Sequence, residues 1–231
     1  MNQDRLAETT SAAGLSLSGA VLAGGLSRRM GQDKALVSLR PGEPPLAGLV
    51  LDRLVTVADD RFLIASDRPH YARFGVRIVP DHYPGAGALG GIATALMASV
   101  HECCFVVACD MPLLNLALLK WMAAEPRDYD VLIPHVPGKS RQGGDLVYHT
   151  LHAIYARSCL AAIEPRLAAG DLRVISFFPD VRVRSIDLAR IARFDPHLHS
   201  FFNANTPEAA IRAAELLDRE NASPADTVGQ T

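Results

Sequence analysis

The chain lacks several features that mark particular classes of protein. Only four of its 231 residues are cysteine, and none forms a C-x-x-C pair, so neither a disulfide framework nor a zinc ribbon is expected. Its apolar runs are short and are broken by glycine, proline or charged residues, so no membrane span is predicted. The formal net charge of −2 argues against a nucleic-acid-binding protein, which would normally carry a basic excess.

The N-terminus also lacks the apolar segment of a secretory signal, and it carries Asp4 and Glu8. Together with the unpaired cysteines, this favours a protein of the reducing cytoplasm, with its thiols buried as small hydrophobic groups. No internal repeat or linker divides the chain. We therefore expect a disordered N-terminal segment at 1–17, a single domain at 18–220 and a disordered tail at 221–231.

Short apolar runs of strand character alternate with helical patterns along the chain. The expected strands are 19–23, 61–66, 76–80, 103–110, 129–135 and 181–187. The expected helices are 45–60, 89–102, 114–125, 151–170 and 206–220. The first five strands are almost entirely apolar, which indicates burial on both faces of a parallel sheet, whereas 181–187 alternates as an edge strand does. This order predicts a three-layer, Rossmann-like α/β domain with a mostly parallel sheet.

A glycine-rich, cationic loop follows the first strand. Gly24 and Gly25 allow a ligand to approach the backbone closely, and Arg28, Arg29 and Lys34 add positive charge. Ligands of parallel sheets bind beyond the carboxyl ends of the strands, which is where this loop begins. Its spacing matches neither the phosphate-binding motif G-x-x-x-x-G-K-[ST] nor the dinucleotide motif G-x-G-x-x-G. We interpret it as a phosphate cradle of another kind rather than as a merely solvated surface loop.

Two aspartates follow apolar strands at the same expected edge of the sheet. Asp110 comes after the run CCFVVAC, and we predict that it binds Mg²⁺, which proteins commonly hold with one or two carboxylates plus substrate phosphates. The alternative is that Asp110 caps the helix expected near Leu114. Asp81 precedes a glycine-rich loop, which either faces a ligand or simply connects a strand to a helix.

Two asparagines precede the last expected helix, for which Thr206 is the predicted N-cap. The amides of Asn203 and Asn205 either bind the polar edge of a ligand or only close the turn. The neighbouring histidines His149 and His152 complete no zinc motif. We expect them to be exposed or hydrogen-bonded.

The segment LAGGLSRRMGQDKAL (22–36) resembles the L-A-G-G-x-S-x-R-M-G-x-D-K signature of the molybdenum cofactor guanylyltransferases. The segments CDMP and NANTPE are similar to that family's later motifs in order and separation, and the resemblance spans roughly 18–217. It implies a nucleotidyltransferase fold and the transfer of GMP from GTP to the terminal phosphate of molybdopterin, with release of pyrophosphate. The resemblance is also compatible with protein partners that deliver molybdopterin or that take part in the maturation of molybdoenzymes.

The same resemblance implies roles for individual residues. Lys34 and Arg29 would bind the nucleotide phosphates and act in catalysis with Asp110, which would also hold Mg²⁺. Asp81 would contact the nucleoside. The remaining implied ligand-binding positions are Leu22, Ala23, Gly24 and Gly25 along the nucleotide, and Asn203 and Asn205 toward molybdopterin.

One position departs from the family pattern. Family members carry an asparagine after the second strand that helps to hold the nucleotide, and Ala65 stands there in this chain. This leaves open a nucleotidyltransferase that uses CTP or another phosphate acceptor, although L-A-G-G and the Asp33–Lys34 pair are typical of the guanylyl enzymes. A non-catalytic nucleotide-binding module is the alternative from another class, and the complete charged set of Lys34, Asp81 and Asp110 argues against it.

Overall fold

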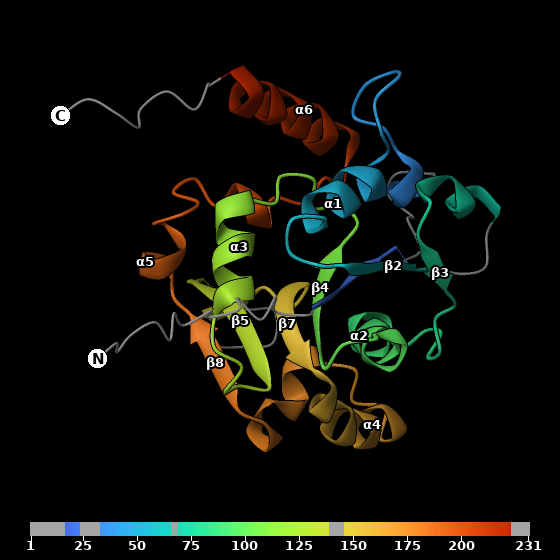
Figure 1. Cartoon of the computed structure of the whole chain (residues 1–231), viewed down its shortest axis with the longest axis vertical. Helices are drawn as coiled ribbons and strands as arrows, with labels where there is room; N and C mark the ends of the chain where they lie inside the picture. Colours follow the sequence, from blue (N-terminus) through green and yellow to red (C-terminus); the bar gives the residue numbers. More distant parts are fainter. Residues whose placement is uncertain (1–16, 24–32, 66–68, 139–145, 223–231) are drawn as a thin grey trace, which may run out of the picture.

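A mixed sheet runs through the centre of the computed structural model, which describes residues 17–23, 33–65, 69–138 and 146–222 (Figure 1). Within these residues the strand order is β3-β2-β1-β4-β7-β5-β6, and β8 pairs with β5. The strands are β1 (Ser18–Leu22), β2 (Asp60–Ile64), β3 (Arg77–Val79), β4 (Cys103–Ala108), β5 (Val131–Pro137), β6 (Leu146–Tyr148), β7 (His152–Ala156) and β8 (Val183–Ile186). Apart from Leu17, Asn221 and Ala222, the chain ends for which we expect disorder lie outside the described residues.

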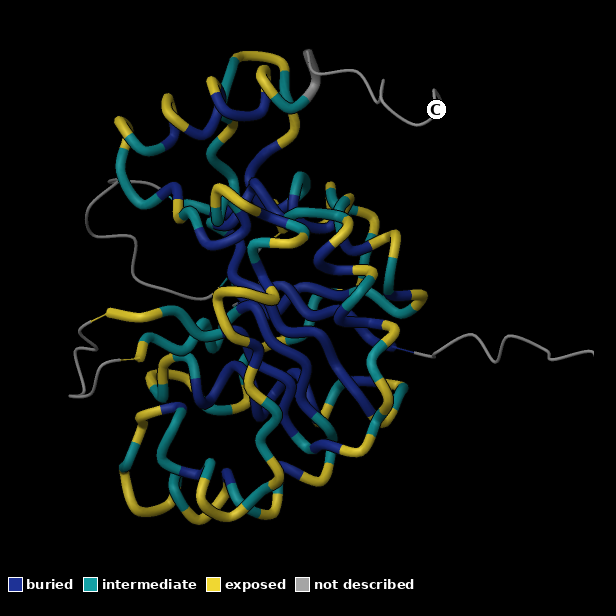
Figure 2. Tube along the Cα trace, turned by 90° about the vertical axis from the view of Figure 1, so that its left-hand side faces the viewer, coloured by how far each residue is buried: buried dark blue, intermediate teal, exposed yellow. Residues whose placement is uncertain are grey.

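Helices cover both faces of the sheet. They are α1 (Leu46–Leu54), α2 (Gly87–Ala98), α3 (Leu116–Ala124), α4 (Leu160–Ala168), α5 (Leu188–Ile191) and α6 (Pro207–Ala222). Alternate residues of each strand belong to two separate cores, one on each face of the sheet. Val21 and Phe105 pack with α1 and α3. Ala20 and Val106 pack with α2 and α4. Figure 2 shows the buried interior that results. The three predicted layers are confirmed, and no helix of the described part is long and apolar enough to cross a membrane.

One half of the sheet is parallel and places its carboxyl ends at a common edge. β3, β2, β1 and β4 run in the same direction, and Leu22 is level with Ile64 and Ala108. Two backbone bonds continue this ladder, from Ala23 N to Ile64 O at 2.9 Å and from Cys109 N to Leu22 O at 3.1 Å. The residues that follow β1, β2 and β4 therefore meet at the edge where ligands of such sheets bind.

The predicted helix over 151–170 is wrong at its start. Residues His152–Ala156 form β7, which is antiparallel to β4, and the α-helix begins only at Leu160. The successive residues Ala153, Ile154 and Tyr155 are all buried, as in a strand inside a sheet and not as on one face of a surface helix. Gly170, at φ +71°, follows α4 as the predicted stop.

The other half of the sheet is mixed. β5 is parallel to β8, as predicted for the strand at 129–135, but it is antiparallel to β7, so its setting is mixed. The unpredicted strand β6 has three residues, too few to show a period in sequence. β8 pairs with β5 beside the main strand path, in agreement with its edge-like alternation.

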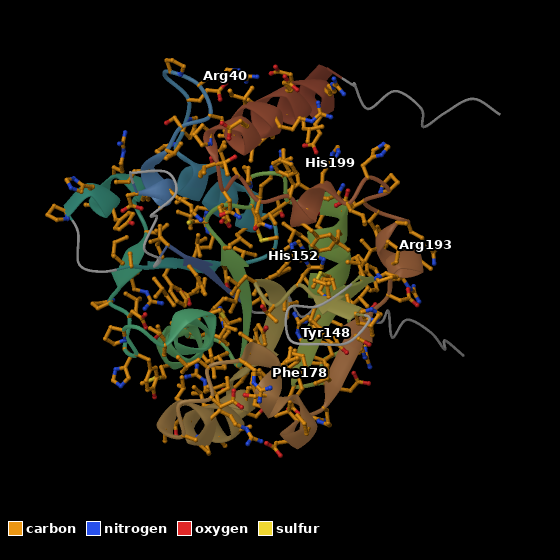
Figure 3. All side chains as sticks on the ribbon, turned by 180° about the vertical axis from the view of Figure 1, so that it is seen from behind. Arg40, Tyr148, His152, Phe178, Arg193 and His199 are labelled. Carbon is orange, nitrogen blue, oxygen red and sulfur yellow. The ribbon has the colours of Figure 1, made fainter. Side chains whose placement is uncertain are left out.

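The last helix, α6, ties separate parts of the chain together. Thr206 Oγ1 accepts from a backbone N–H in its first turn, so the predicted N-cap is confirmed. Its buried alanine and leucine side chains form a small separate core with Leu46 and Leu113. Arg40, which lies beside α6 in Figure 3, donates to a carbonyl of this helix at 2.9 Å. α6 is thus attached both to the segment that follows β1 and to the segment that follows β4.

Gly90 tests how tightly the start of α2 is packed. A Cβ on Gly90 would lie 2.8 Å from Ala86 Cβ and 2.9 Å from Tyr83 O. Replacing a helical glycine by alanine normally stabilises a protein by about 1 kcal/mol, but here overpacking should lower the free energy of unfolding by about 1–3 kcal/mol. Urea unfolding of Gly90→Ala measures this change.

Gly48→Ala in α1 is the matched control. A Cβ at this position would meet Pro44 Cβ at 3.4 Å, which is an ordinary contact. This variant should gain stability. A gain in both variants contradicts the packing described for α2.

Candidate active site

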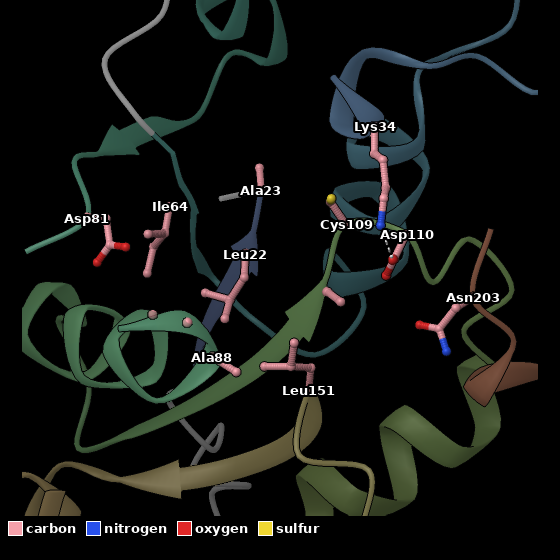
Figure 4. A pocket seen from close by; sticks show the side chains of 13 residues that line it. Leu22, Ala23, Lys34, Ile64, Asp81, Ala88, Cys109, Asp110, Leu151 and Asn203 are labelled. Carbon is pink, nitrogen blue, oxygen red and sulfur yellow. Dashed lines mark hydrogen bonds and ion pairs between the residues drawn. The ribbon is translucent and has the colours of Figure 1, made fainter. Parts of the chain in front are cut away.

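A pocket of about 300 Å³ lies at the carboxyl edge of the parallel strands (Figure 4). Its walls come from the ends of β1, β2 and β4, the start of α2, the turn before β7 and the segment before α6. The lining residues are Leu22, Ala23, Lys34, Ile64, Asp81, Gly87, Ala88, Gly91, Ala108, Cys109, Asp110, Leu151 and Asn203. The pocket therefore occupies the place where the topology predicts a ligand.

Lys34 and Asp110 lie together in one wall of this pocket. Lys34 Nζ is 3.3 Å from Asp110 Oδ2 and donates to Asn205 Oδ1 at 2.5 Å. The side chains of Lys34 and Asp110 are 25% and 13% exposed, so the pair is largely shielded from water. Shielding strengthens its electrostatic interaction relative to that of a surface ion pair.

The backbone holds Asp110 in this place. Its carbonyl accepts from Ala204 N at 2.8 Å, which joins it to the segment before α6. α3 begins at Leu116, and its first turn is capped by Asn115, whose Oδ1 accepts from Leu118 N at 3.0 Å. The alternative of Asp110 as the cap of this helix is therefore wrong, and its carboxylate is left to face the pocket.

One oxygen of this carboxylate suits a cation. Asp110 Oδ1 is buried and makes no hydrogen bond within the described part of the chain, which is costly for a charged group unless a cation approaches. The described residues contain no group of three or more His, Cys, Asp or Glu side chains placed to hold a metal ion. A site with one protein carboxylate still fits Mg²⁺, because phosphates and water commonly complete its coordination.

Asp81 is fixed on the opposite side of the pocket. Its Oδ1 accepts from Tyr83 N at 3.0 Å and from Thr94 Oγ1 at 3.1 Å. Of the glycine-rich loop that follows, the structure places Gly87 and Gly91 on the pocket. A Cβ on Gly91 would lie 2.8 Å from Leu22 Cδ1, so this glycine allows α2 to approach the end of β1.

The two asparagines have different environments. Asn203 lines the pocket and donates from Nδ2 to Phe201 O at 3.1 Å. Asn205 directs its side chain to Lys34, while its backbone N–H closes the turn onto Asn203 O at 3.0 Å. Of the other predicted ligand-binding residues, Leu22 and Ala23 line the pocket, whereas Gly24, Gly25 and Arg29 lie outside the described residues.

Sequence reasoning missed the apolar part of the lining. Ile64, Ala88, Ala108 and Leu151 carry no chemical signature, and Leu151 was hidden by the wrong helix prediction. Ala65 belongs to the buried core and is not among the residues that line the pocket. All four cysteines are free and buried, as predicted, and burial raises the pKa of each thiol.

The histidines near the pocket differ from our expectation. His152, labelled in Figure 3, is fully buried, and neither ring nitrogen makes a hydrogen bond of ordinary geometry within the described part. His149 stacks on Phe201 with ring centroids 3.9 Å apart, and His152 meets the same ring at 5.0 Å. Burial lowers the pKa of His149 to about 4 and that of His152 to about 3. Both rings are therefore neutral at pH 7 and pack as aromatic groups.

The fold and this pocket define a class of protein. A Rossmann-like sheet with a cation and a carboxylate side by side at its carboxyl edge is typical of a nucleotide-binding domain. Residues 19–181 match the family described as the MobA-like NTP transferase domain. The protein is a nucleotidyltransferase of this class.

Full-length relatives narrow the class further. A probable molybdenum cofactor guanylyltransferase from Pelotomaculum thermopropionicum is 36% identical over 204 residues, which cover 88% of this chain and 95% of the relative. A molybdenum cofactor guanylyltransferase from Desulfosudis oleivorans is 32% identical over 207 residues, with coverages of 87% and 98%. Among solved structures, molybdopterin-guanine dinucleotide biosynthesis protein A from Archaeoglobus fulgidus matches with a TM-score of 0.71 and 27% identity, over 87% of this chain and 99% of that one. The chain belongs to the molybdenum cofactor guanylyltransferase family.

His152 should make the fold sensitive to acid. Because its folded pKa lies well below that of an unfolded histidine, near 6.5, the unfolded state binds the proton first and stability falls as pH drops below that value. Between pH 7 and pH 5 this histidine should lower the free energy of unfolding by about 2 kcal/mol. Urea unfolding at both pH values should show a smaller loss for His152→Leu. An equal loss in the variant and the wild type contradicts the neutral, buried state of this ring.

Proposed function

We propose that the protein transfers GMP from GTP to the terminal phosphate of molybdopterin and releases pyrophosphate, with Mg²⁺ as its metal ion. The observation that carries this proposal is the ammonium of Lys34 beside the carboxylate of Asp110, in a pocket at the carboxyl edge of the sheet. The names of the relatives in the family supply the identity of the two substrates.

The reaction asks the protein for positioning and charge stabilisation rather than for a covalent intermediate. An oxygen of the acceptor's terminal phosphate attacks the α-phosphorus of GTP, the bond from that phosphorus to the oxygen bridging the β-phosphate breaks, and pyrophosphate leaves. The attacking phosphate is already ionised at neutral pH, so no general base is required. Lys34 offsets the negative charge that develops on the α-phosphate and on the leaving group. We assign Arg29 the same role on the basis of the family resemblance.

In this proposal the carboxylate of Asp110 would hold Mg²⁺, because its Oδ1 makes no hydrogen bond in the described part of the chain, whereas Oδ2 faces Lys34. When bound, the ion neutralises charge on the phosphates and so adds to the effect of Lys34. Asp81 contacts the nucleoside, held in one orientation by Thr94 and the backbone of Tyr83. Asn203 faces the acceptor side of the pocket. In this proposal the nucleoside and the reacting phosphates lie against opposite walls of the pocket.

CTP is the second candidate nucleotide, and Ala65 is the observation that favours it. The small apolar side chain at this position is buried in the core and cannot supply the amide that the family pattern places there. The missing amide affects the choice between a guanine and a cytosine base. It does not change the charges that act on the triphosphate. Nucleotidyl transfer is therefore common to both candidates.

Removal of either charge should slow the reaction strongly. We expect Lys34→Ala and Asp110→Asn each to lower the rate of pyrophosphate release from GTP and molybdopterin by about 10²–10³. Circular dichroism checks that each variant is folded. Lys120→Ala and Asp52→Asn are the matched controls, because both side chains are exposed on helices outside the pocket. Near-wild-type turnover in either pocket variant contradicts the mechanism.

The choice of base can be tested without the acceptor. Melting temperatures should be recorded with each of the four nucleoside triphosphates in the presence of Mg²⁺. GTP should stabilise the protein, by about 2.7 kcal/mol at a concentration 100-fold above its dissociation constant, and CTP should not. Stabilisation by CTP and not by GTP rejects the guanylyl assignment and retains the second candidate.

A further inference from the structure

We propose that Tyr71 is a positioning residue for Lys34. Its hydroxyl group orients the carboxylate of Asp33, and that carboxylate caps the turn from which the Lys34 side chain extends. The inference rests on the proposed function only in assigning Lys34 to a nucleoside triphosphate. It concerns a residue outside the family signature and away from the pocket lining.

One hydrogen bond connects Tyr71 to the turn that carries Lys34, and two further bonds lie within that turn. Tyr71 Oη donates to Asp33 Oδ2 at 2.7 Å. The other oxygen of this carboxylate, Oδ1, accepts from Ala35 N at 3.2 Å, which makes Asp33 the N-cap of the short helix η1 (Lys34–Leu36). The carbonyl of Asp33 accepts from Leu36 N at 3.0 Å. One carboxylate thus joins the tyrosine to the backbone on both sides of Lys34.

The tyrosine itself is held rigidly by the core. It is 1% exposed and belongs to the same buried cluster as Val50 and Leu51 of α1. Its ring stacks on that of Phe74, with centroids 6.1 Å apart. A hydroxyl group on a fixed ring loses little rotational freedom when it binds a carboxylate, and hydrogen bonds to ionised groups are stronger than those between neutral groups.

Tyr71 comes from a different part of the chain than Lys34. It lies in η2 (Pro69–Phe74), in the connection between β2 and β3. At the right of Figure 1, this teal-green turn lies beside the blue turn of η1. Ala35, the neighbour of Lys34, is fully buried, so the turn is anchored on the core as well as capped. The lysine therefore extends from a fixed backbone and meets Asp110 and Asn205 at its far end.

Such support matters because lysine is a long and flexible side chain. A displacement of about 1 Å at a reacting group can cost roughly 10²-fold in rate. If the Tyr71 hydroxyl is removed, Asp33 keeps its charge but loses the hydrogen bond that Tyr71 donates to Oδ2. We expect a smaller effect than the loss of Lys34 itself, about 10-fold in kcat/KM for GTP.

The experiment compares Tyr71→Phe with Tyr129→Phe. Tyr129 is also buried, at 3% exposure, and its hydroxyl group pairs with Arg127, but it does not line the pocket. Both variants remove a hydroxyl group that makes a hydrogen bond in the described part of the chain, and they should lose similar stability. Tyr71→Phe should lower kcat/KM for GTP about 10-fold and leave the KM for molybdopterin unchanged, whereas Tyr129→Phe should change neither. Wild-type kcat/KM in Tyr71→Phe overturns the proposal, as does an equal loss in both variants.

A double variant tests whether Tyr71 acts through Asp33. When Asp33→Ala has already removed the carboxylate, the further change Tyr71→Phe should have no additional effect on kcat/KM for GTP. If the loss of kcat/KM in the double variant equals the product of the two single losses, the tyrosine acts by another route. That result overturns the proposal.

Binding of a nucleotide without the acceptor separates this inference from the proposed function. If the wild type releases no pyrophosphate from GTP and molybdopterin, the proposed function fails. Tyr71 is then tested by the dissociation constant of whichever Mg²⁺–nucleoside triphosphate binds the wild type. A dissociation constant about 10-fold higher for Tyr71→Phe than for Tyr129→Phe supports the inference, and equal constants overturn it.

Discussion

The ammonium group of Lys34 lies between Asp110 Oδ2 and Asn205 Oδ1, at 3.3 and 2.5 Å. Lys34 follows β1, Asp110 follows β4 and Asn205 precedes α6. Their contact therefore requires both the sheet and the C-terminal helix to be in place. A cation and a carboxylate therefore meet at this point, where we propose that they bind the phosphates and a metal ion. Because both charges are largely shielded from water, each acts more strongly on a ligand than it would on an open surface.

Backbone geometry brings these groups to the same edge. The bond from Cys109 N to Leu22 O keeps the ends of β4 and β1 level, and the bond from Ala204 N to the Asp110 carbonyl brings in the segment before α6. Packing then supports this frame from both faces of the sheet. The neutral rings of His149 and His152 fill the space against Phe201, two residues before Asn203.

The sequence was most informative where an apolar strand pattern is followed directly by charged residues. The apolar runs of β1 and β4 and the charged residues after them predicted the parallel half of the sheet and the place of Lys34 and Asp110. β7 was not recognised, because only the short helix η3 (Arg157–Cys159) separates it from α4, and that segment contains neither glycine nor proline. The pairing of Asn205 with Lys34 joins residues 171 positions apart, and no local pattern encodes such a contact. The burial of His152 likewise arises from β4 and from the segment around Phe201, both distant in sequence.

We expect the pocket to transfer a nucleotidyl group and not a phosphoryl group. The fate of a radioactive label tests it directly, with GTP labelled in either the α- or the γ-phosphate and incubated with molybdopterin, Mg²⁺ and the protein. We predict that the α label appears in a molybdopterin dinucleotide and that the γ label appears in pyrophosphate. Transfer of the γ label to the acceptor, or its release as inorganic phosphate with formation of GDP, would contradict nucleotidyl transfer.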